Sequence, residues 1–191
     1  MDEFSRSLGG REIQITTNSG TDITARIDSR RAHRQWGRST KPGRSSAPPN
    51  IETAVSPVEG TAEDAAVIDG SIPFPGIGIL NNPVRLEIRK ERITAIDGGT
   101  EASALREGIS GMRDPAAYRL AEIGVGFNHR SWLCGRMLED EELMGFAHFS
   151  FGGNLSFGGE IASPFHRDMV FFRPAITVDG RTIMTGGVIK G

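Results

Sequence analysis

Alternating apolar and polar positions recur along the chain and predict short antiparallel strands rather than long helices. The clearest alternation covers residues 12–16 and returns over residues 22–27, with a turn at Asn18-Ser19-Gly20 between them. Two strand-like runs joined by such a turn are typical of a β-hairpin, so residues 11–28 are predicted to form one. The same pattern predicts further hairpins over residues 83–96 and 175–184.

Helical spacing is confined to a few short stretches. Residues 100–109 place Ala102, Leu105 and Ile109 on one stripe, and Thr100 is positioned to cap the helix. Other elements are predicted from shorter patterns: strands at 51–55, 66–70 and 121–127, a helix at 115–120, and an acidic helical turn at 140–144. These elements together predict an α+β fold in a single domain over residues 1–191. Its sheet is expected to be mostly antiparallel and barrel-like, with a few short helices on one side.

Residues 29–50 differ from their surroundings because they lack alternation and are rich in arginine, glycine, serine and proline. We predict a long basic loop. Its arginines are Arg30, Arg31, Arg34, Arg38 and Arg44. The simplest interpretation is a mobile surface loop. The functional alternative is a substrate lid whose guanidinium groups hold a carboxylate or phenolate.

Composition narrows the classes of protein that fit. Lys+Arg 22 against Asp+Glu 24 gives a net charge of −2, which does not favour nucleic-acid or anionic-membrane binding. A single cysteine, Cys134, excludes an internal disulfide, and a reducing cytoplasmic setting is the default expectation. The first residues lack the hydrophobic core of a signal peptide, and no apolar run reaches membrane-spanning length.

The stretch that carries most of the candidate chemistry runs from Ala147 to Asp168. His166 and Asp168 are two residues apart, so on an extended strand they point to the same face. His148 lies on its own short apolar run, which is expected to pack beside that strand. Imidazole and carboxylate groups are good metal ligands. Two histidines and one carboxylate that leave coordination positions open match the facial triad of non-heme iron enzymes. The same groups with additional carboxylates suit zinc, manganese or cobalt.

The competing interpretation of this stretch is a β-rich domain with glycine bulges and two surface histidines. An His-x-Asp triplet alone is weak evidence, but the glycine density at Gly152-Gly153 and Gly158-Gly159 favours backbone passing close to a ligand. Glu52 and Glu122 also stand among apolar neighbours. On position alone, Glu52 is expected on the solvent face of its strand rather than aimed at a cation. His129 is a secondary catalytic candidate, and an exposed or hydrogen-bonded loop histidine is the simpler expectation for it.

Several motifs recur here in the order found in a known family. They are residues 17–22 (TNSGTD), 52–57 (ETAVSP), 67–70 (VIDG), 121–126 (AEIGVG), 148–153 (HFSFGG) and His166-x-Asp168. In this combination the chain resembles the catalytic portion of the thermophilic metalloaminopeptidases of the aminopeptidase T and S type. It is also similar to their iron-dependent relative, 2,5-dihydroxypyridine 5,6-dioxygenase. The resemblance extends from about Glu12 to Gly191.

The resemblance to the peptidases implies a two-metal centre that polarises an amide carbonyl and shares a bridging hydroxide. It implies five metal ligands: Glu52, Glu122, His148, His166 and Asp168. Glu52 is alternatively the general base. Family members carry an additional N-terminal α/β domain that this sequence does not include. The peptidases also have a catalytic tyrosine shortly after the first motif histidine, whereas the only tyrosine here is Tyr118. Asn154 is the residue expected to donate a hydrogen bond in its place.

Three functions follow from these observations. The first is a metal-dependent hydrolase of a peptide or small amide, using one or two Zn, Mn or Co ions, and it is favoured by the number of candidate ligands. The second is a mononuclear Fe(II) dioxygenase of a hydroxylated aromatic ring, using His148, His166 and Asp168, and it is favoured by the missing tyrosine. The third is a non-catalytic, metal-stabilised module. The resemblance also implies a homodimer, and the expected partner is a small-molecule or peptide substrate.

Overall fold

The computed structural model describes residues 1–40, 42–43, 46 and 48–190, and within these two antiparallel sheets dominate the fold. The eight-stranded sheet has the order β15-β14-β13-β1-β2-β5-β8-β9. Its strands are β1 (Glu12–Thr16), β2 (Asp22–Arg26), β5 (Glu63–Ile68), β8 (Val84–Arg89), β9 (Arg92–Asp97), β13 (Ala175–Val178), β14 (Arg181–Thr185) and β15 (Val188–Ile189).

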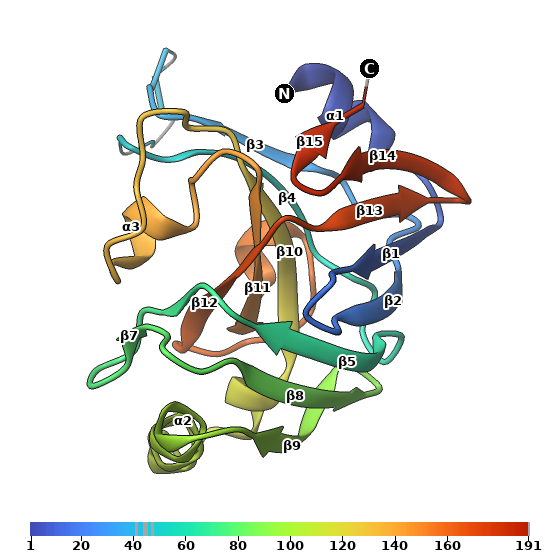
Figure 1. Ribbon diagram of the computed structural model, residues 1–191. Coiled ribbons are helices and arrows are strands. Elements are labelled where there is room, and N and C mark those ends of the chain that lie inside the picture. The colour runs from blue at the N-terminus through green and yellow to red at the C-terminus, as the bar shows by residue number, and fades with distance from the viewer. Residues whose placement is uncertain (41, 44–45, 47, 191) are drawn as a thin grey trace.

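The seven-stranded sheet has the order β3-β4-β10-β11-β12-β6-β7. Its strands are β3 (His33–Trp36), β4 (Ile51–Val55), β6 (Ser71–Ile72), β7 (Gly78–Ile79), β10 (Leu120–Gly126), β11 (Phe146–Gly152) and β12 (His166–Phe172). Figure 1 shows β10, β11 and β12 running across the direction of β5 and β8. The two sheets therefore pack with crossed strands, and the core lies between them.

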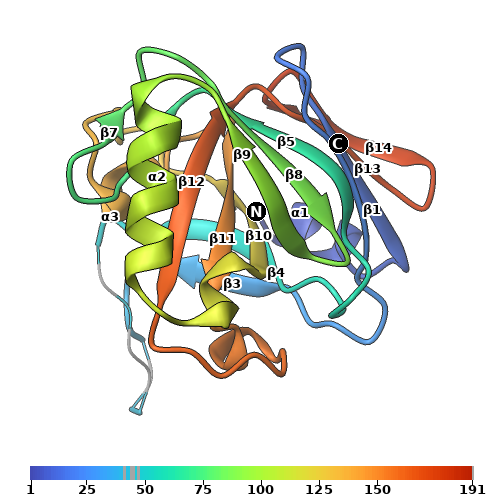
Figure 2. The same cartoon turned by 90° about the horizontal axis from the view of Figure 1, so that it is seen from below.

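Helices are short and lie at the edges of the sheets. They are α1 (Asp2–Ser7), α2 (Thr100–Gly111) and α3 (Met137–Asp140), with 3₁₀ turns η1 (Pro115–Tyr118) and η2 (Leu155–Phe157). The longest, α2, buries Ala102, Leu105 and Ile109 and lies beside β8 and β9, as seen in Figure 2. This is the stripe that the sequence predicts. The prediction of an α+β fold with mostly antiparallel sheet is confirmed.

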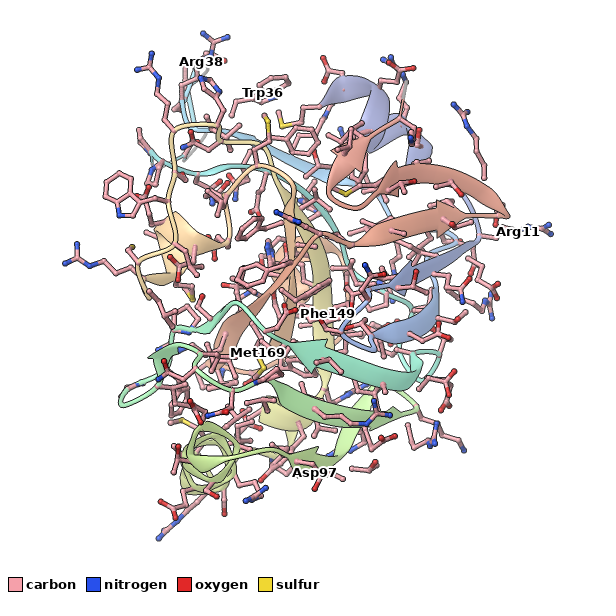
Figure 3. The ribbon with its side chains drawn as sticks, in the orientation of Figure 1. Arg11, Trp36, Arg38, Asp97, Phe149 and Met169 are labelled. Carbon is pink, nitrogen blue, oxygen red and sulfur yellow. The ribbon has the colours of Figure 1, made fainter. Side chains whose placement is uncertain are left out.

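The core is formed by the inward positions of strands that alternate along the sequence. On β1, Ile13 and Ile15 are fully buried while the residues between and around them are exposed or half-buried. The central strands β10 and β11 are buried almost throughout, because both faces are covered. Figure 3 shows Phe149 and Met169 in the interior and Arg11 at the periphery.

Strand pairing bears out the three predicted hairpins. β1 pairs with β2, β8 with β9, and β13 with β14, all antiparallel. In the second hairpin, Lys90 and Glu91 both have positive φ, the turn conformation that matches the twist of the flanking strands.

Residues 29–50 are not the continuous loop that the composition predicts. Residues His33–Trp36 form β3, an edge strand that pairs antiparallel with β4, with Gln35 opposite Glu52. His33 and Gln35 are half-buried while Arg34 and Trp36 are exposed, so the strand has the alternation of a sheet edge. Figure 3 shows Trp36 and Arg38 at the outer edge of the molecule. Arg44 lies outside the described residues.

Other boundaries differ from prediction for local reasons. β5 begins at Glu63, before the strand predicted at 66–70, because β2 and β8 supply backbone partners on both sides. Gly99, not Thr100, is the N-cap of α2, and the Thr100 hydroxyl donates to Glu101 instead. Residues 115–118 form a 3₁₀ turn with Asp114 as its cap. The predicted acidic turn is displaced towards the N-terminus, as α3. None of the helices in the described ranges combines the length and apolarity needed to cross a membrane.

Candidate metal centre

The candidate site is built on one face of four neighbouring strands of the seven-stranded sheet. The strand register sets Glu122 opposite Ser150 and Ser150 opposite Asp168, which places the three side chains in a row across β10, β11 and β12. Because side chains two residues apart share a face, His148 and His166 join the same surface. Glu52 reaches it from β4, the strand on the other side of β10.

The five side chains form two overlapping groups around a shared carboxylate. Potential ligand atoms of Glu122, His166 and Asp168 all lie within 4.8 Å of one another. A second group satisfies the same condition and comprises Glu52, Glu122 and His148. The structure therefore brings all five predicted ligands together. The two histidines fall in different groups.

Individual distances within the first group are short. Nε2 of His166 lies 3.2 Å from Oε2 of Glu122 and 3.6 Å from Oδ1 of Asp168. In the second group, Nε2 of His148 lies 3.4 Å from Oε2 of Glu52. Glu52, Glu122, His148 and Asp168 are each at most 5% exposed, whereas the side chain of His166 is 29% exposed and opens to the cavity.

Two observations show that a cation fits this arrangement. Oε2 of Glu52, Oε1 of Glu122 and Nδ1 of His148 are buried without a hydrogen-bond partner among the described residues. Leaving such groups unsatisfied is costly, and a bound cation would satisfy the carboxylates. The second observation is Gly124, where a Cβ atom would lie 2.1 Å from Nε2 of His148. The absence of a side chain at this position makes room for the imidazole beside the carboxylates.

A second layer of contacts orients the first group. Nδ1 of His166 donates to the carbonyl oxygen of Gly153 at 2.8 Å, which leaves Nε2 free to face the carboxylates. The hydroxyl of Ser150 lies between the two acids, 3.3 Å from Oε2 of Glu122 and in hydrogen-bond contact with Oδ1 of Asp168. These contacts resemble the outer-shell partners that hold metal ligands in position.

Burial and crowding of acids perturb the pKa values of the site. Burial, followed by the charges of Glu122 and Glu142, raises the pKa of Glu52 well above its usual range. Burial alone would raise the pKa of Asp168, but His148 and a hydrogen bond from Glu141 outweigh it and hold that pKa low. Concentrated perturbations of this kind are typical of functional sites.

The pKa of His166 is raised as well, which in a histidine favours the charged form. Burial disfavours its charged form, yet the hydrogen bond to Glu122 and the charge of Asp168 raise the pKa of His166 to about 9. In the absence of a cation, the imidazolium partly compensates the surrounding carboxylates. A metal ion would take over that role and bind the neutral imidazole.

Two acids of the site were missed by sequence reasoning. Glu141 and Glu142 follow α3, are almost fully buried, and face the five predicted ligands. Burial and the charge of Asp168 raise the pKa of Glu141, and burial raises that of Glu142 to about 8. A run of four acids, Glu139-Asp140-Glu141-Glu142, ordinarily reads as a solvated surface. No local signal distinguishes it from one.

Next to these ligands lies a cavity of about 410 Å³. Its polar wall includes Gln35, Asn50 and Ser163, and its apolar wall includes Met137 and Ile161. The size and mixed lining suit a small molecule held by a few polar groups.

The structure also settles where three further candidates lie: Glu52, His129 and Asn154. Glu52 is buried and faces the site, so the expectation that it lies on the solvent face is wrong. His129 is exposed in the turn after β10 and does not line the cavity, so the structure does not bring it to the site. Asn154 is fully buried, but its amide donates to Ser56 and Glu59 and accepts from the Ile161 amide. Its hydrogen-bonding groups therefore hold a loop, and a catalytic role for it stays a prediction.

Comparison with known proteins gives consistent results over nearly the whole chain. A sequence model of a family described as 2,5-dihydroxypyridine 5,6-dioxygenase matches residues 5–191. A protein of that name from Pseudomonas putida (strain KT2440) is 29% identical over 187 residues, which is 93% of this chain and 53% of that protein. This chain thus spans about half the length of the curated relative it matches.

Among solved structures, a dioxygenase is again more similar to this chain than the second structure compared. The 2,5-dihydroxypyridine dioxygenase of Pseudomonas putida KT2440 superposes with a TM-score of 0.88 and 26% identity, over 98% of this chain and 57% of that one. Wild-type AmpT from Thermus thermophilus superposes with a TM-score of 0.77 at 16% identity, over 100% of this chain and 53% of that one. The likeness to AmpT is one of fold alone.

These findings overturn the first of the three functions expected from the sequence. The abundance of carboxylates favours a hydrolase, but the family match and the more similar relatives are dioxygenases. The number of candidate ligands does not distinguish the two chemistries, because all five lie together in a chain of the dioxygenase family.

Proposed function

The chain belongs to the 2,5-dihydroxypyridine 5,6-dioxygenase family, and from this premise we propose that its site is an iron(II) centre that opens a small hydroxylated aromatic ring with dioxygen. The proposed substrate class is a dihydroxylated pyridine or a closely related ring. What supports the proposal most is the family match over residues 5–191, because that segment contains both groups of candidate metal ligands.

We assign the iron to Glu122, His166 and Asp168, the group whose histidine is the more exposed to the cavity. Imidazole and carboxylate donors suit iron(II), and three protein ligands leave positions open for other molecules. His166 is the half-exposed member, so these open positions would face the cavity of about 410 Å³. When bound, iron(II) would supply the redox chemistry that brings dioxygen and the ring together.

The chain's own residues have separate tasks in this proposal. Gly153 and Ser150 hold the ligands in orientation through the contacts described above. Gln35 and Asn50 offer polar groups to a hydroxylated ring, and Met137 and Ile161 exclude water from it. Glu52, paired with His148 beside the iron ligands, is placed to hold a proton released by a ring hydroxyl.

The test is an anaerobic preparation loaded with iron(II), followed by oxygen-electrode measurements with 2,5-dihydroxypyridine. We expect about one tightly bound iron per chain and oxygen uptake in proportion to the substrate consumed. Asp168→Asn keeps the side-chain shape but removes the charge, and it should abolish uptake. Glu107→Gln, an exposed position on α2, is the matched control and should leave uptake unchanged.

Two results would contradict the proposal. One is an iron-loaded chain that consumes no oxygen with any dihydroxylated ring. The other is oxygen uptake that survives in Asp168→Asn, which would place the chemistry elsewhere.

A further inference from the structure

Phe157 makes a contact with the candidate iron ligand His166 that the assignment above does not use. The two rings are nearly parallel, with 13° between their planes and 5.5 Å between their centroids. On its other side Phe157 meets His33 of β3 edge-on, with centroids 5.3 Å apart and planes at 70°. Phe157 therefore sits between a site histidine and an edge strand, in contact with the cavity.

The loop that carries Phe157 is anchored by one half-buried carboxylate, that of Glu59, which we call the Glu59 hub. Glu59 accepts from the side-chain amide of Asn154 at 2.9 Å and from the backbone N–H of Glu160 at 2.8 Å. It also forms an ion pair with Arg30, whose guanidinium in addition donates to the carbonyl of Gly158. Residues 154–160 are thus tied at both ends to one carboxylate. Figure 2 shows this segment in orange below β3.

The conformation of the loop depends on two glycines. Gly158 has a φ of +79°, which a side chain would strain. At Gly159 a Cβ atom would lie 2.1 Å from the side chain of Asn154, so only glycine lets the chain close over that amide. This explains the glycine density that the sequence shows here. Both glycines also restrict the loop to the conformation seen here.

His166 is consequently constrained in two independent ways. Its Nδ1–H donates to Gly153, which fixes the direction in which Nε2 points. Its ring face rests on Phe157, which fixes the plane of the imidazole. Metal affinity falls when such outer contacts are lost, because the ligand must then be ordered at the moment of binding.

We propose that Phe157 is a positioning residue for the metal ligand His166, held in place by the Glu59 hub. The inference rests on the metal-site part of the proposed function and not on the identity of the substrate. It also gives Arg30 a structural task, since its guanidinium is engaged with Glu59 and Gly158 rather than free to hold a substrate anion.

The experiment measures cobalt(II) affinity, from visible absorption in competition with a chelator, in Phe157→Leu, Phe157→Tyr and wild-type protein. Cobalt(II) serves as an oxygen-stable spectroscopic probe of the same ligand set. We expect Phe157→Leu to lose about 10–100-fold in affinity, as is usual for outer-shell contacts. Phe157→Tyr keeps the stacked ring and should stay close to wild type. Glu59→Gln, which weakens the anchor, should shift affinity in the same direction as Phe157→Leu.

Phe146→Leu is the matched control. Phe146 is a half-buried phenylalanine that packs edge-on against Phe172 and lines a hollow separate from the cavity beside the ligands, so its loss should lower stability without changing cobalt affinity. A second readout is the chemical shift of the His166 ring protons in metal-free protein. In Phe157→Leu these should lose the ring-current shift of the stacked phenylalanine.

The proposal is overturned if folded Phe157→Leu binds cobalt with wild-type affinity. It is also overturned if Phe146→Leu loses as much cobalt affinity as Phe157→Leu loses. Should Phe157→Leu not fold, Phe157→Tyr and Glu59→Gln decide the question through the same titration. Failure of the proposed dioxygenase activity would leave these affinities unaffected. The two claims are therefore separable.

Discussion

At the scale of single residues, the defining feature is the number of carboxyl groups withdrawn from water in one place. Glu52, Glu122, Asp168, Glu141 and Glu142 are each at most 5% exposed. Burying an acid without a compensating charge raises its pKa, because the charged form loses hydration. A folded protein retains such groups only where something outweighs the cost. A bound cation is the simplest compensation that this ligand set offers.

Glu142 permits a direct test of this cost. Its pKa is raised to about 8, chiefly by burial, so the folded state holds its proton more tightly than the unfolded state does. The stability this gives is complete below the ordinary glutamate pKa and is lost as the pH rises towards 8. Glu142→Gln keeps an oxygen for the Ile51 amide but cannot ionise. We expect it to raise the unfolding free energy of metal-free protein at pH 8 by on the order of 1–3 kcal/mol.

The measurement is a urea-unfolding series from pH 5 to pH 8 in the presence of a chelator. Wild-type stability should decline over this range, and the decline should be shallower in Glu142→Gln. The exposed change Glu107→Gln provides the reference slope. Equal slopes in Glu142→Gln and wild type would show that Glu142 ionises as freely as a surface glutamate.

At the scale of elements, the sequence predicts those helices, hairpins and shared faces that follow from the spacing of neighbouring residues. The alternation in 12–16 and 22–27 identified a hairpin, and the two-residue spacing of His166 and Asp168 identified a shared face. Both rest on the period of a strand, which is a local property. The helix at 100–109 was found for the same reason, through its stripe of Ala102, Leu105 and Ile109.

What could not be predicted depends on which strands become neighbours. Gln35 lies in a stretch without alternation, and it belongs to a strand only because β4 provides a partner edge. The position of Glu52 is ambiguous in the sequence, since either face of a five-residue strand can be the inner one. The burial of Glu141 and Glu142 follows from α3 folding back over the site. No sequence pattern in that acidic run encodes this.

Gly124 tests whether the strand face is shaped for His148. In Gly124→Ala the new Cβ would lie 2.1 Å from Nε2 of His148, so the imidazole must move. Because that ring is packed in the core, we expect a loss of about 1–3 kcal/mol in stability. The displacement should also change the metal-binding spectrum. Unfolding titrations and cobalt(II) absorption measure the two effects.

The control for this prediction is Gly111→Ala, at the end of α2. Nothing lies within 4 Å of its added Cβ, so stability should be unchanged or slightly increased. If Gly124→Ala behaves like Gly111→Ala, the imidazole is free to move and its position is not set by the glycine.

At the scale of the whole molecule, the site joins strands from β4 to β12 and makes folding and metal binding interdependent. A ligand that binds only the folded state stabilises it by about 2.7 kcal/mol when present at 100 times its Kd. For a chain of this size we expect iron(II) or cobalt(II) to raise the melting temperature by roughly 5–10 °C at that excess. Thermal melts under anaerobic conditions measure the shift. Asp168→Asn should show little of it, and an equal shift in that variant would place the bound metal elsewhere.

The measurement that tests the central claim most directly is turnover of 2,5-dihydroxypyridine under ¹⁸O₂ in ordinary water, with the product analysed by mass spectrometry. A dioxygenase places both atoms of one dioxygen molecule in its ring-opened product. We predict a product equal in mass to the substrate plus ¹⁸O₂, formed only by iron-loaded protein. A product that carries oxygen from water alone, or the absence of ring opening by iron-loaded protein, would contradict the account.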